Sequence, residues 1–211
     1  MHWHTLVFAI AATSPVAAQA PSLLVVPDRD IGPLRITSTY QSLLQALGPT
    51  AIKRSDVHLG EGIFEPGAEL FPNDSLRRAT IYFGDTLGLT RPLGLTISSR
   101  GTLWQLPSGI TVGTTLQRLE QLNGRPFTFN GFGWDYSGRG ADWQGGQLAT
   151  IVGTNLELGV TLAVTCQDAL TPAEVDSLVG DRQVLSSDPA ARRACIQVRE
   201  LWLGFPANRR P

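Results

Sequence analysis

A short helical pattern that occurs twice, 76 residues apart, constrains the fold of this chain more than any other feature. In the first copy, Ser38 and Gln41 are spaced as a capping box, in which each side chain satisfies a free backbone N–H group of the first helical turn. The apolar residues then follow the spacing of one helical face: Tyr40, Leu43, Leu44 and Leu47. Gly48 and Pro49 end the helix, so the pattern predicts a short amphipathic helix.

The second copy keeps the same offset. Thr114 and Gln117 are spaced as the capping box, Leu116 and Leu119 face inward, and Gly124 ends the helix. Two interpretations fit this recurrence. The favoured one is an internal duplication of a strand–helix–hairpin unit. The other is that two ordinary capped helices share common residues by chance.

Segments with strand composition, separated by turn signals, fill most of the remaining chain. They are LLVV (23–26), AELF (68–71), ATIYF (79–83), LTISS (95–99), TLWQL (102–106), PFTFNGF (126–132), GADWQGGQLATIV (140–152), LELGVTLAVTC (156–166) and IQVRELWLGF (196–205). TPAEVDSLVGD (171–181) and SSDPAARRA (186–194) are predicted as short helical pieces. Because the strands arrive consecutively, we predict an α+β fold: a mainly antiparallel sheet with short helices packed on one face.

The predicted organisation begins with a secretory signal peptide at 1–18, where an apolar run precedes small residues and a Val-Ala-Ala site. A lead-in at 19–30 and two α+β repeats at 31–100 and 101–211, packed as one unit, follow. No segment is long and apolar enough to be a permanent membrane span. The net charge is −1 and the chain has no basic stripe, which excludes nucleic acid as the expected partner. We expect a periplasmic or secreted protein.

The chain has two cysteines, Cys166 and Cys195. In an oxidising compartment an isolated pair predicts one disulfide bond, which is the favoured interpretation. The alternative is two separate buried thiols.

The stretch NGRPFTFNGFGWDYSG (123–138) has the highest density of aromatic residues in the chain. Aromatic rings beside a carboxylate are typical of a sugar-binding or protein-binding surface. The candidate ligand-binding residues here and in the next predicted strand are Trp134, Asp135, Tyr136 and Trp143. The favoured alternative is architectural: Trp134 packs on Trp143, and Asp135 with Asn130 caps the turn.

An acidic stretch at 56–74 contains Asp56, Glu61, Glu65, Glu69 and Asp74. Glu61 and Glu65 are the candidate acid and base of a glycoside hydrolase, although solvated loop charges are the favoured interpretation. The carboxylate spacing matches no metal-binding loop, and His58 is the only histidine after the signal segment. We therefore expect no metal, no cofactor and no catalytic residues.

The two helix approaches, GPLRITSTYQSLLQALGP and SGITVGTTLQRLEQLNGRP, resemble the repeats of the β-lactamase inhibitor protein and the start of the small lipoprotein of the β-barrel assembly machinery. This resemblance implies a helical layer against an antiparallel sheet. The chain lacks the lipid-bearing cysteine of the second family and the disulfide within each repeat of the first, so no functional residues are carried over. The chain, particularly IGPL, LNGRPF and GFGWDYSG, also looks like a group of exported bacterial proteins, and this resemblance implies no function.

These observations predict an exported, non-catalytic binding or interaction module with a protein or envelope-polymer partner. The alternative is a cell-envelope hydrolase that uses a carboxylate pair, with Glu61, Glu65 or Asp135 as the candidate residues.

Overall fold

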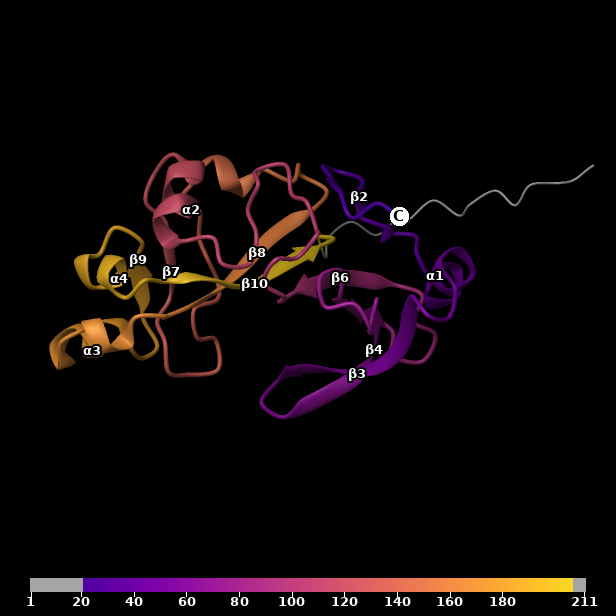
Figure 1. Ribbon diagram of the computed structural model, residues 1–211, viewed down its shortest axis with the longest axis horizontal. Helices are drawn as coiled ribbons and strands as arrows, with labels where there is room; N and C mark the ends of the chain where they lie inside the picture. Colours follow the sequence, from indigo (N-terminus) through magenta and orange to yellow (C-terminus); the bar gives the residue numbers. More distant parts are fainter. Residues whose placement is uncertain (1–20, 207–211) are drawn as a thin grey trace, which may run out of the picture.

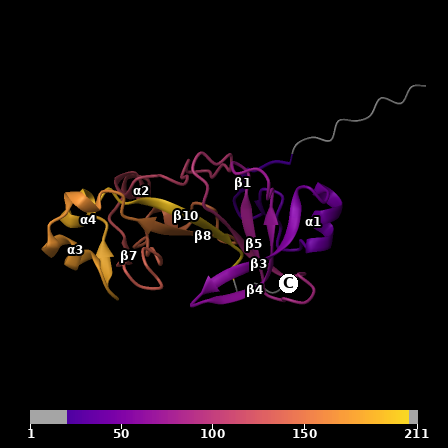
Figure 2. The ribbon, with the colours of Figure 1, turned by 60° about the horizontal axis from the view of Figure 1, so that its bottom comes forward.

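The structure, a computed structural model, describes residues 21–206. The predicted signal segment of the chain, 1–18, lies outside the described residues. The described chain is elongated, with a twisted sheet in the middle, α1 at one end and α3 and α4 at the other (Figure 1). Figure 2 shows the same arrangement after a turn about the long axis.

The central element is a six-stranded antiparallel sheet with strand order β3-β4-β5-β6-β10-β8. Its strands are β3 (Ile52–Gly60), β4 (Ile63–Leu70), β5 (Ala79–Phe83), β6 (Pro92–Ile97), β8 (Glu157–Ala163) and β10 (Gln197–Gly204). The predicted α+β class and antiparallel sheet are confirmed. Because β10 pairs with both β6 and β8, one sheet joins the two predicted repeats.

Strand alternation gives this sheet two different faces. Ile81 of β5 and Leu201 and Leu203 of β10 are fully buried on the core face. The other face, which we call the open face, carries half-buried side chains, including Tyr82 and Trp202. A half-buried sheet of this kind is usual for antiparallel strands.

Helices α1 (Tyr40–Leu47) and α2 (Leu116–Asn123) pack their predicted apolar faces against the same core as the sheet. Leu43 is 3% exposed, whereas Leu116 and Leu119 are completely buried. The two helices keep the 76-residue offset, but the elements after them differ. A four-strand meander follows α1, and only the three-residue β7 (Thr128–Asn130) follows α2 directly. The duplication therefore stays a prediction.

The N-caps lie one residue later than predicted. Thr39 and Thr115 accept the capping hydrogen bonds, from the N–H groups of Ser42 and Arg118. The hydroxyls of the predicted caps accept hydrogen bonds from N–H groups that precede them in the chain. Ser38 accepts from the Arg35 N–H at 2.9 Å, and Thr114 accepts from the Thr111 N–H at 2.9 Å. Adjacent hydroxyl residues can exchange these roles because both bonds are local.

The short helices of the last third gather at one end of the molecule and do not cover the sheet (Figures 1 and 2). Helix α3 (Pro172–Leu178) starts as predicted, with Thr171 as N-cap and Pro172 at the first position. The other elements at this end are η2 (Gln167–Ala169), β9 (Gln183–Leu185), which pairs with β7, and α4 (Pro189–Arg193). The short helix η1 (Gln147–Ala149) lies against α2 instead. The prediction that helices lie on one sheet face therefore describes α1 and α2 better than α3 and α4.

The disulfide bond between Cys166 and Cys195 is confirmed. It joins the segment after β8 to the segment between α4 and β10. The Cys166 N–H also donates to the Ala194 carbonyl, so the bridge stands beside a backbone contact. The cross-link ties the α3–α4 end to the sheet.

Two strand predictions were wrong, and one strand was not predicted. The predicted strands at 102–106 and 140–152 are not regular strands, whereas residues 52–60, for which no strand was predicted, form β3. In place of a strand, Trp104 is buried and its indole N–H donates to the Arg77 carbonyl at 2.9 Å. The region 140–152 buries Trp143, Leu148 and Val152 from an irregular loop.

The hairpin of β3 and β4 extends past the rest of the sheet. Strand β4 pairs with β5 only through Ala68, Glu69 and Leu70, so the residues nearer the turn have no second neighbour strand. We call residues 55–66 the β3–β4 arm, which projects at the bottom of Figure 1. Its exposed apolar residues, Leu59, Ile63 and Phe64, lie near the turn. Smaller strands β1 (Val25–Val26) and β2 (Asp30–Ile31) pair with each other in the lead-in region.

Candidate functional site

The open face of the sheet carries a cleft of about 290 Å³. Four strands supply its floor, through Tyr82 of β5, Thr96 of β6, Gly159 of β8, and Glu200 and Trp202 of β10. The β3–β4 arm supplies one wall with His58 and Leu59, and the loop 131–140 supplies the other with Arg139 and Gly140. The cleft therefore combines residues from both halves of the chain.

Strand pairing brings the floor residues together. Tyr82 alternates with buried Ile81 and Phe83, so its ring points to the open face. Trp202 lies between buried Leu201 and Leu203 in the same way and stands opposite Thr96 of β6. This contact between residues far apart in sequence exists only because β10 inserts between β6 and β8.

Trp202 and Tyr82 form an aromatic corner. Their ring centroids are 5.5 Å apart with an interplanar angle of 71°. This is an edge-to-face geometry, which aromatic pairs prefer. The indole fills the space above Gly204, where a Cβ atom would lie 2.6 Å from Nε1. Gly159 on β8 also leaves room, since its Cβ would lie 3.2 Å from the Trp202 Cβ. The glycines therefore let the indole lie close to the sheet as part of the cleft floor.

Two charged groups of the cleft, Glu200 and Arg139, influence the pKa of the Tyr82 hydroxyl. Burial raises the pKa of Tyr82 above its ordinary value of 10.0, and the nearby Glu200 carboxylate raises it further. A hydrogen bond with Thr96 and the positive charge of Arg139 act in the opposite direction on this pKa. Tyr82 is thus a neutral phenol at physiological pH, and the Glu200 carboxylate and the Arg139 guanidinium have opposite effects on its pKa.

A raised pKa for Tyr82 predicts a specific loss of stability in alkali. The stabilising contribution of the protonated phenol is complete below pH of about 10, where the unfolded chain is also protonated, and is lost as the pH rises through the higher folded pKa. We expect the free energy of unfolding to fall more steeply above pH 10 in the wild type than in Tyr82→Phe. Absorbance titration of tyrosinate, as a difference between the two proteins, checks this. A difference pKa at or below 10 would contradict it.

A second hollow of about 160 Å³ adjoins the cleft. Leu59 and Arg139 line both, so we treat the two hollows as one site and call it the sheet groove. The second hollow is also lined by Glu61 and Ile63 of the hairpin turn region and by Asp135 and Tyr136. The sheet groove therefore runs from the aromatic corner to the gap between the arm and the loop 131–140.

The structure separates the four predicted ligand-binding residues. Asp135 and Tyr136 are exposed and line the sheet groove. Trp134 is half-buried behind them: its ring lies edge-on to Tyr136 at 5.2 Å, and its indole N–H donates to the Gly131 carbonyl at 2.9 Å. Trp143 is only 7% exposed and its ring packs on Phe127 at 4.9 Å.

Trp143 is therefore a core residue, and the predicted packing of Trp134 on Trp143 is wrong, because each indole has a different aromatic neighbour. Buried Asn123 fixes the loop around Trp143: its Nδ2 donates to the Trp143 carbonyl at 2.9 Å, and its Oδ1 accepts from the Leu148 N–H at 3.2 Å. Asn130, predicted to cap the turn, instead accepts a bond from the Gln183 side chain at 2.5 Å.

The predicted acidic loop is largely the β3–β4 hairpin. Glu61 and Asp135 line one hollow, whereas Glu65, the other member of the predicted carboxylate pair, does not line it. Among residues 21–206, no group of three or more His, Cys, Asp or Glu side chains is arranged to hold a metal ion. Of the three candidate hydrolase carboxylates, Glu61 and Asp135 therefore line one hollow, whereas Glu65 does not.

Gly138 anchors the loop 131–140 to the sheet. Its carbonyl accepts from the Leu162 N–H of β8 at 2.8 Å. Its φ is 69°, and an added Cβ would lie 2.2 Å from the Leu162 carbonyl oxygen. Only glycine fits this conformation so close to another backbone.

Gly138→Ala is expected to lower the free energy of unfolding by about 2–4 kcal/mol, from the left-handed backbone and from the clash. Gly145→Ala is the matched control, since Gly145 has φ 70° and no atom within 4 Å of an added Cβ. We expect the control to cost about 1–2 kcal/mol. Denaturant unfolding of both variants measures the difference. Equal costs would show that contact with β8 does not constrain this loop.

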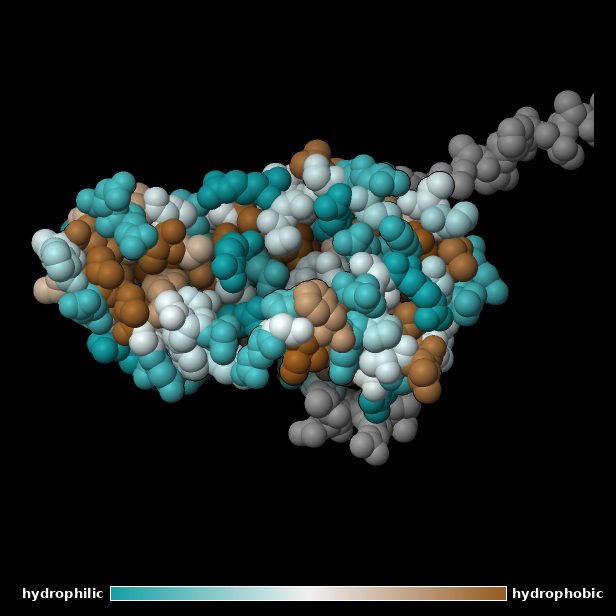
Figure 3. All heavy atoms as spheres, turned by 90° about the horizontal axis from the view of Figure 1, so that it is seen from below, coloured by the Kyte–Doolittle hydropathy of each residue, from teal (hydrophilic) through white to brown (hydrophobic). Residues whose placement is uncertain are grey.

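A third, apolar hollow of about 240 Å³ lies at the α3 end. Phe132, Val164, Leu170 and Val175 line it, with Gln167 as a polar neighbour. Figure 3 shows hydrophobic side chains gathered at this end of the molecule, at the left of the view. The described lining of this hollow contains no charged residue, in contrast to that of the sheet groove.

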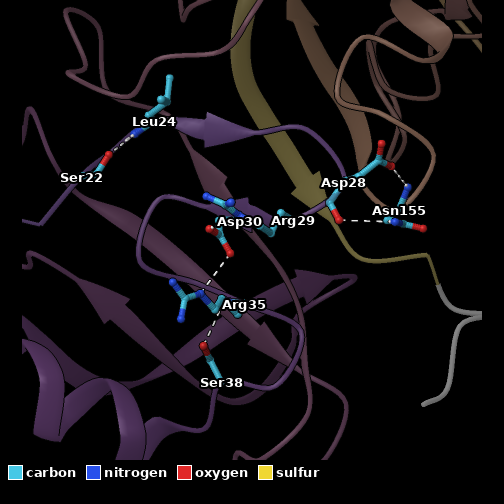
Figure 4. Close-up of polar contacts among 8 residues, drawn as sticks. All are labelled: Ser22, Leu24, Asp28, Arg29, Asp30, Arg35, Ser38 and Asn155. Carbon is cyan, nitrogen blue, oxygen red and sulfur yellow. Dashed lines mark hydrogen bonds and ion pairs between the residues drawn. The ribbon is translucent and has the colours of Figure 1, made fainter.

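A polar cluster near the lead-in is structural (Figure 4). The Asp28 carboxylate accepts from the backbone N–H groups of Thr154 at 2.5 Å and Asn155 at 2.6 Å. Asp30, which is 5% exposed, accepts from the guanidinium groups of Arg29 at 2.8 Å and Arg35 at 3.0 Å. Because these carboxylates bind groups of the chain itself, the cluster holds the lead-in against the body of the protein.

Three residues of the sheet groove were not predicted as site residues: Tyr82, Glu200 and Trp202. Their signal was the alternation of ATIYF and of the last strand, which places these side chains on the polar face. Alternation alone did not reveal that the two strands would approach each other through β6.

Comparison with known proteins adds no assignment. No protein-family model matches this chain, and neither a curated protein nor a solved structure matches it. No helix within residues 21–206 is long and apolar enough to cross a bilayer.

Proposed function

We propose that this protein is an exported, non-catalytic binding module that holds its partner in the sheet groove. The observation that carries this proposal is the aromatic corner of Tyr82 and Trp202 on an open sheet face, with Glu200 and Arg139 beside it. Aromatic and arginine side chains in concave sites contribute strongly to binding energy because they combine contact area with fixed polar groups.

Three further features support this proposal. The arm and the loop 131–140 flank the groove, so a ligand would contact two walls as well as the floor. The exposed apolar residues Ile63 and Phe64 extend the contact surface along the arm. Export is supported by the signal-like sequence at 1–18 and by the disulfide bond, which forms in oxidising compartments.

Affinity capture tests the proposed function. Residues 19–211 would be incubated with an envelope extract, cross-linked, and the captured material identified. We expect capture to depend on Trp202 and Glu200, so Trp202→Ala and Glu200→Gln should each lose the captured partner. Leu87→Ser is the control, because Leu87 is 93% exposed and lies outside the groove. Capture that is unchanged in both groove variants would overturn this assignment of the binding surface.

The second candidate function is that of a cell-envelope hydrolase, and one observation supports it. Glu61 and Asp135 share a hollow with Tyr136, and glycoside cleavage requires two carboxylates across a sugar ring. If this candidate is correct, purified protein should release soluble fragments from cell-wall polymer, and Glu61→Gln or Asp135→Asn should abolish the release. Absence of release by the wild type over the same incubation would eliminate this candidate for that polymer.

A further inference from the structure

We propose that the aromatic corner and Glu200 receive a cationic side chain, arginine or lysine, from an extended segment of a partner protein. This inference rests on the proposed function and deepens it, because it names the chemistry of the ligand. Four properties of the sheet groove carry it: an unpaired carboxylate, two rings in a suitable position, an excess of negative charge and a small volume.

Glu200 is a half-buried carboxylate on the cleft floor. Within the described part of the chain, the ion pairs do not include Glu200, although Asp30, Asp74, Glu120 and Glu174 each have an arginine partner. A carboxylate that has lost part of its hydration and has no cationic partner is stabilised by a ligand that brings one. Glu200 therefore favours a cation as the bound group.

The rings beside Glu200 suit the same ligand. A guanidinium or ammonium group over the face of Trp or Tyr is attracted by the ring quadrupole, and desolvation strengthens the attraction. Tyr82 and Trp202 meet at 71°, so one cation in the corner can contact both rings. The aliphatic part of the lysine or arginine side chain would pack on the same surface.

The charges along the rest of the groove have the same sign. Glu61 and Asp135 line the second hollow, and neither belongs to an ion pair among residues 21–206. Arg139 is the one arginine or lysine among the described lining residues of the two hollows. Three carboxylates against one guanidinium give a surface complementary to a basic segment. Arg139, between the hollows, can donate to backbone carbonyl groups of that segment.

The size of the cleft distinguishes a side chain from a larger ligand. A volume of about 290 Å³ lies at the lower end of the range for small-molecule sites, roughly 300–1,000 Å³. One long side chain fits this space better than several sugar rings. A neutral polysaccharide would also gain nothing from the excess negative charge of the groove.

Peptide binding tests the inference. The probe is an acetylated and amidated octapeptide of alternating glycine and arginine, and its matched neutral control replaces each arginine by citrulline. Isothermal titration calorimetry at low ionic strength should detect binding of the arginine peptide to residues 19–211, with at least about ten-fold weaker binding of the citrulline peptide. Raising the salt concentration should weaken the arginine peptide more than the control.

Variants locate the binding site. Glu200→Gln should weaken binding of the arginine peptide about ten-fold, and Trp202→Leu about three- to ten-fold. Asp176→Asn is the control, because Asp176 is exposed on α3 and does not line the sheet groove. It removes one negative charge and should change the affinity less than about two-fold, since salt screens charges outside the groove. Circular dichroism of each variant confirms that it is folded, and the isosteric Glu200→Gln keeps the test valid if Trp202→Leu is destabilised.

Three outcomes of the peptide experiments would overturn the inference: no detectable binding of the arginine peptide, equal binding of the citrulline peptide, or an equal effect of Glu200→Gln and Asp176→Asn. Tight binding of a neutral sugar oligomer that survives Glu200→Gln would overturn it in favour of a polysaccharide ligand. These failures differ from failure of the proposed function. If affinity capture still depends on Trp202 while the arginine peptide does not bind, the groove remains the binding site and only the ligand chemistry is wrong.

Discussion

Replacing Cys166 and Cys195 together by serine is expected to lower the free energy of unfolding by about 3–4 kcal/mol. The two residues are 29 positions apart, so the bond restricts a loop of intermediate length in the unfolded chain. The native backbone contacts beside the bridge remain in the variant. The Thr165 and Cys166 N–H groups donate to the Ala194 carbonyl, each at 3.2 Å. The expected loss therefore reports mainly the greater freedom of the unfolded state.

Denaturant unfolding of the wild type and the double variant, both in non-reducing buffer, measures this loss. The wild type treated with dithiothreitol is the control, and it should lose a similar amount without any change of sequence. Serine also keeps the side-chain volume close to that of a reduced cysteine. A loss below about 1 kcal/mol would contradict a stabilising role for the bond. In that case the α3–α4 end would be held mainly by packing.

Leu119→Ala is expected to lower the free energy of unfolding by about 3–5 kcal/mol. Leu119 is completely buried in the core that α2 shares with the sheet, so truncation leaves a cavity as well as removing apolar contact. Gln121→Ala is the matched control on the same helix, because Gln121 is exposed and should change stability by less than about 0.5 kcal/mol. Denaturant unfolding again gives the values. If both variants lose the same amount, the buried face assigned to α2 is incorrect.

The helices could be predicted well because their signals are local. An apolar stripe, a hydroxyl before the first turn and a glycine after the last all lie within one segment. The remaining error was of one residue at each N-cap, where Ser38–Thr39 and Thr114–Thr115 offer two hydroxyls in succession. Which hydroxyl caps depends on how the chain enters the helix, and the sequence pattern does not contain that geometry.

The strands could be predicted only where hydrophobic residues alternate. ATIYF and the last strand have this alternation, whereas β3 (IKRSDVHLG) is an edge strand with charged residues, so its sequence did not predict a strand. The loop 140–152 produced the opposite error. Trp143, Leu148 and Val152 are buried there, so the segment has apolar residues to bury, but it buries them without a continuous strand ladder.

From the sequence by itself, the α+β class, the buried faces of α1 and α2 and the pairing of the two cysteines could be worked out, since each depends on short-range patterns or on there being only two cysteines. The sheet groove was decided by tertiary structure alone. Trp202 reaches Thr96 and Tyr82 because β10 pairs with β6 across more than a hundred residues, and Arg139 and His58 arrive from two further segments. Strand order depends on the packing of the whole core, which no local pattern specifies.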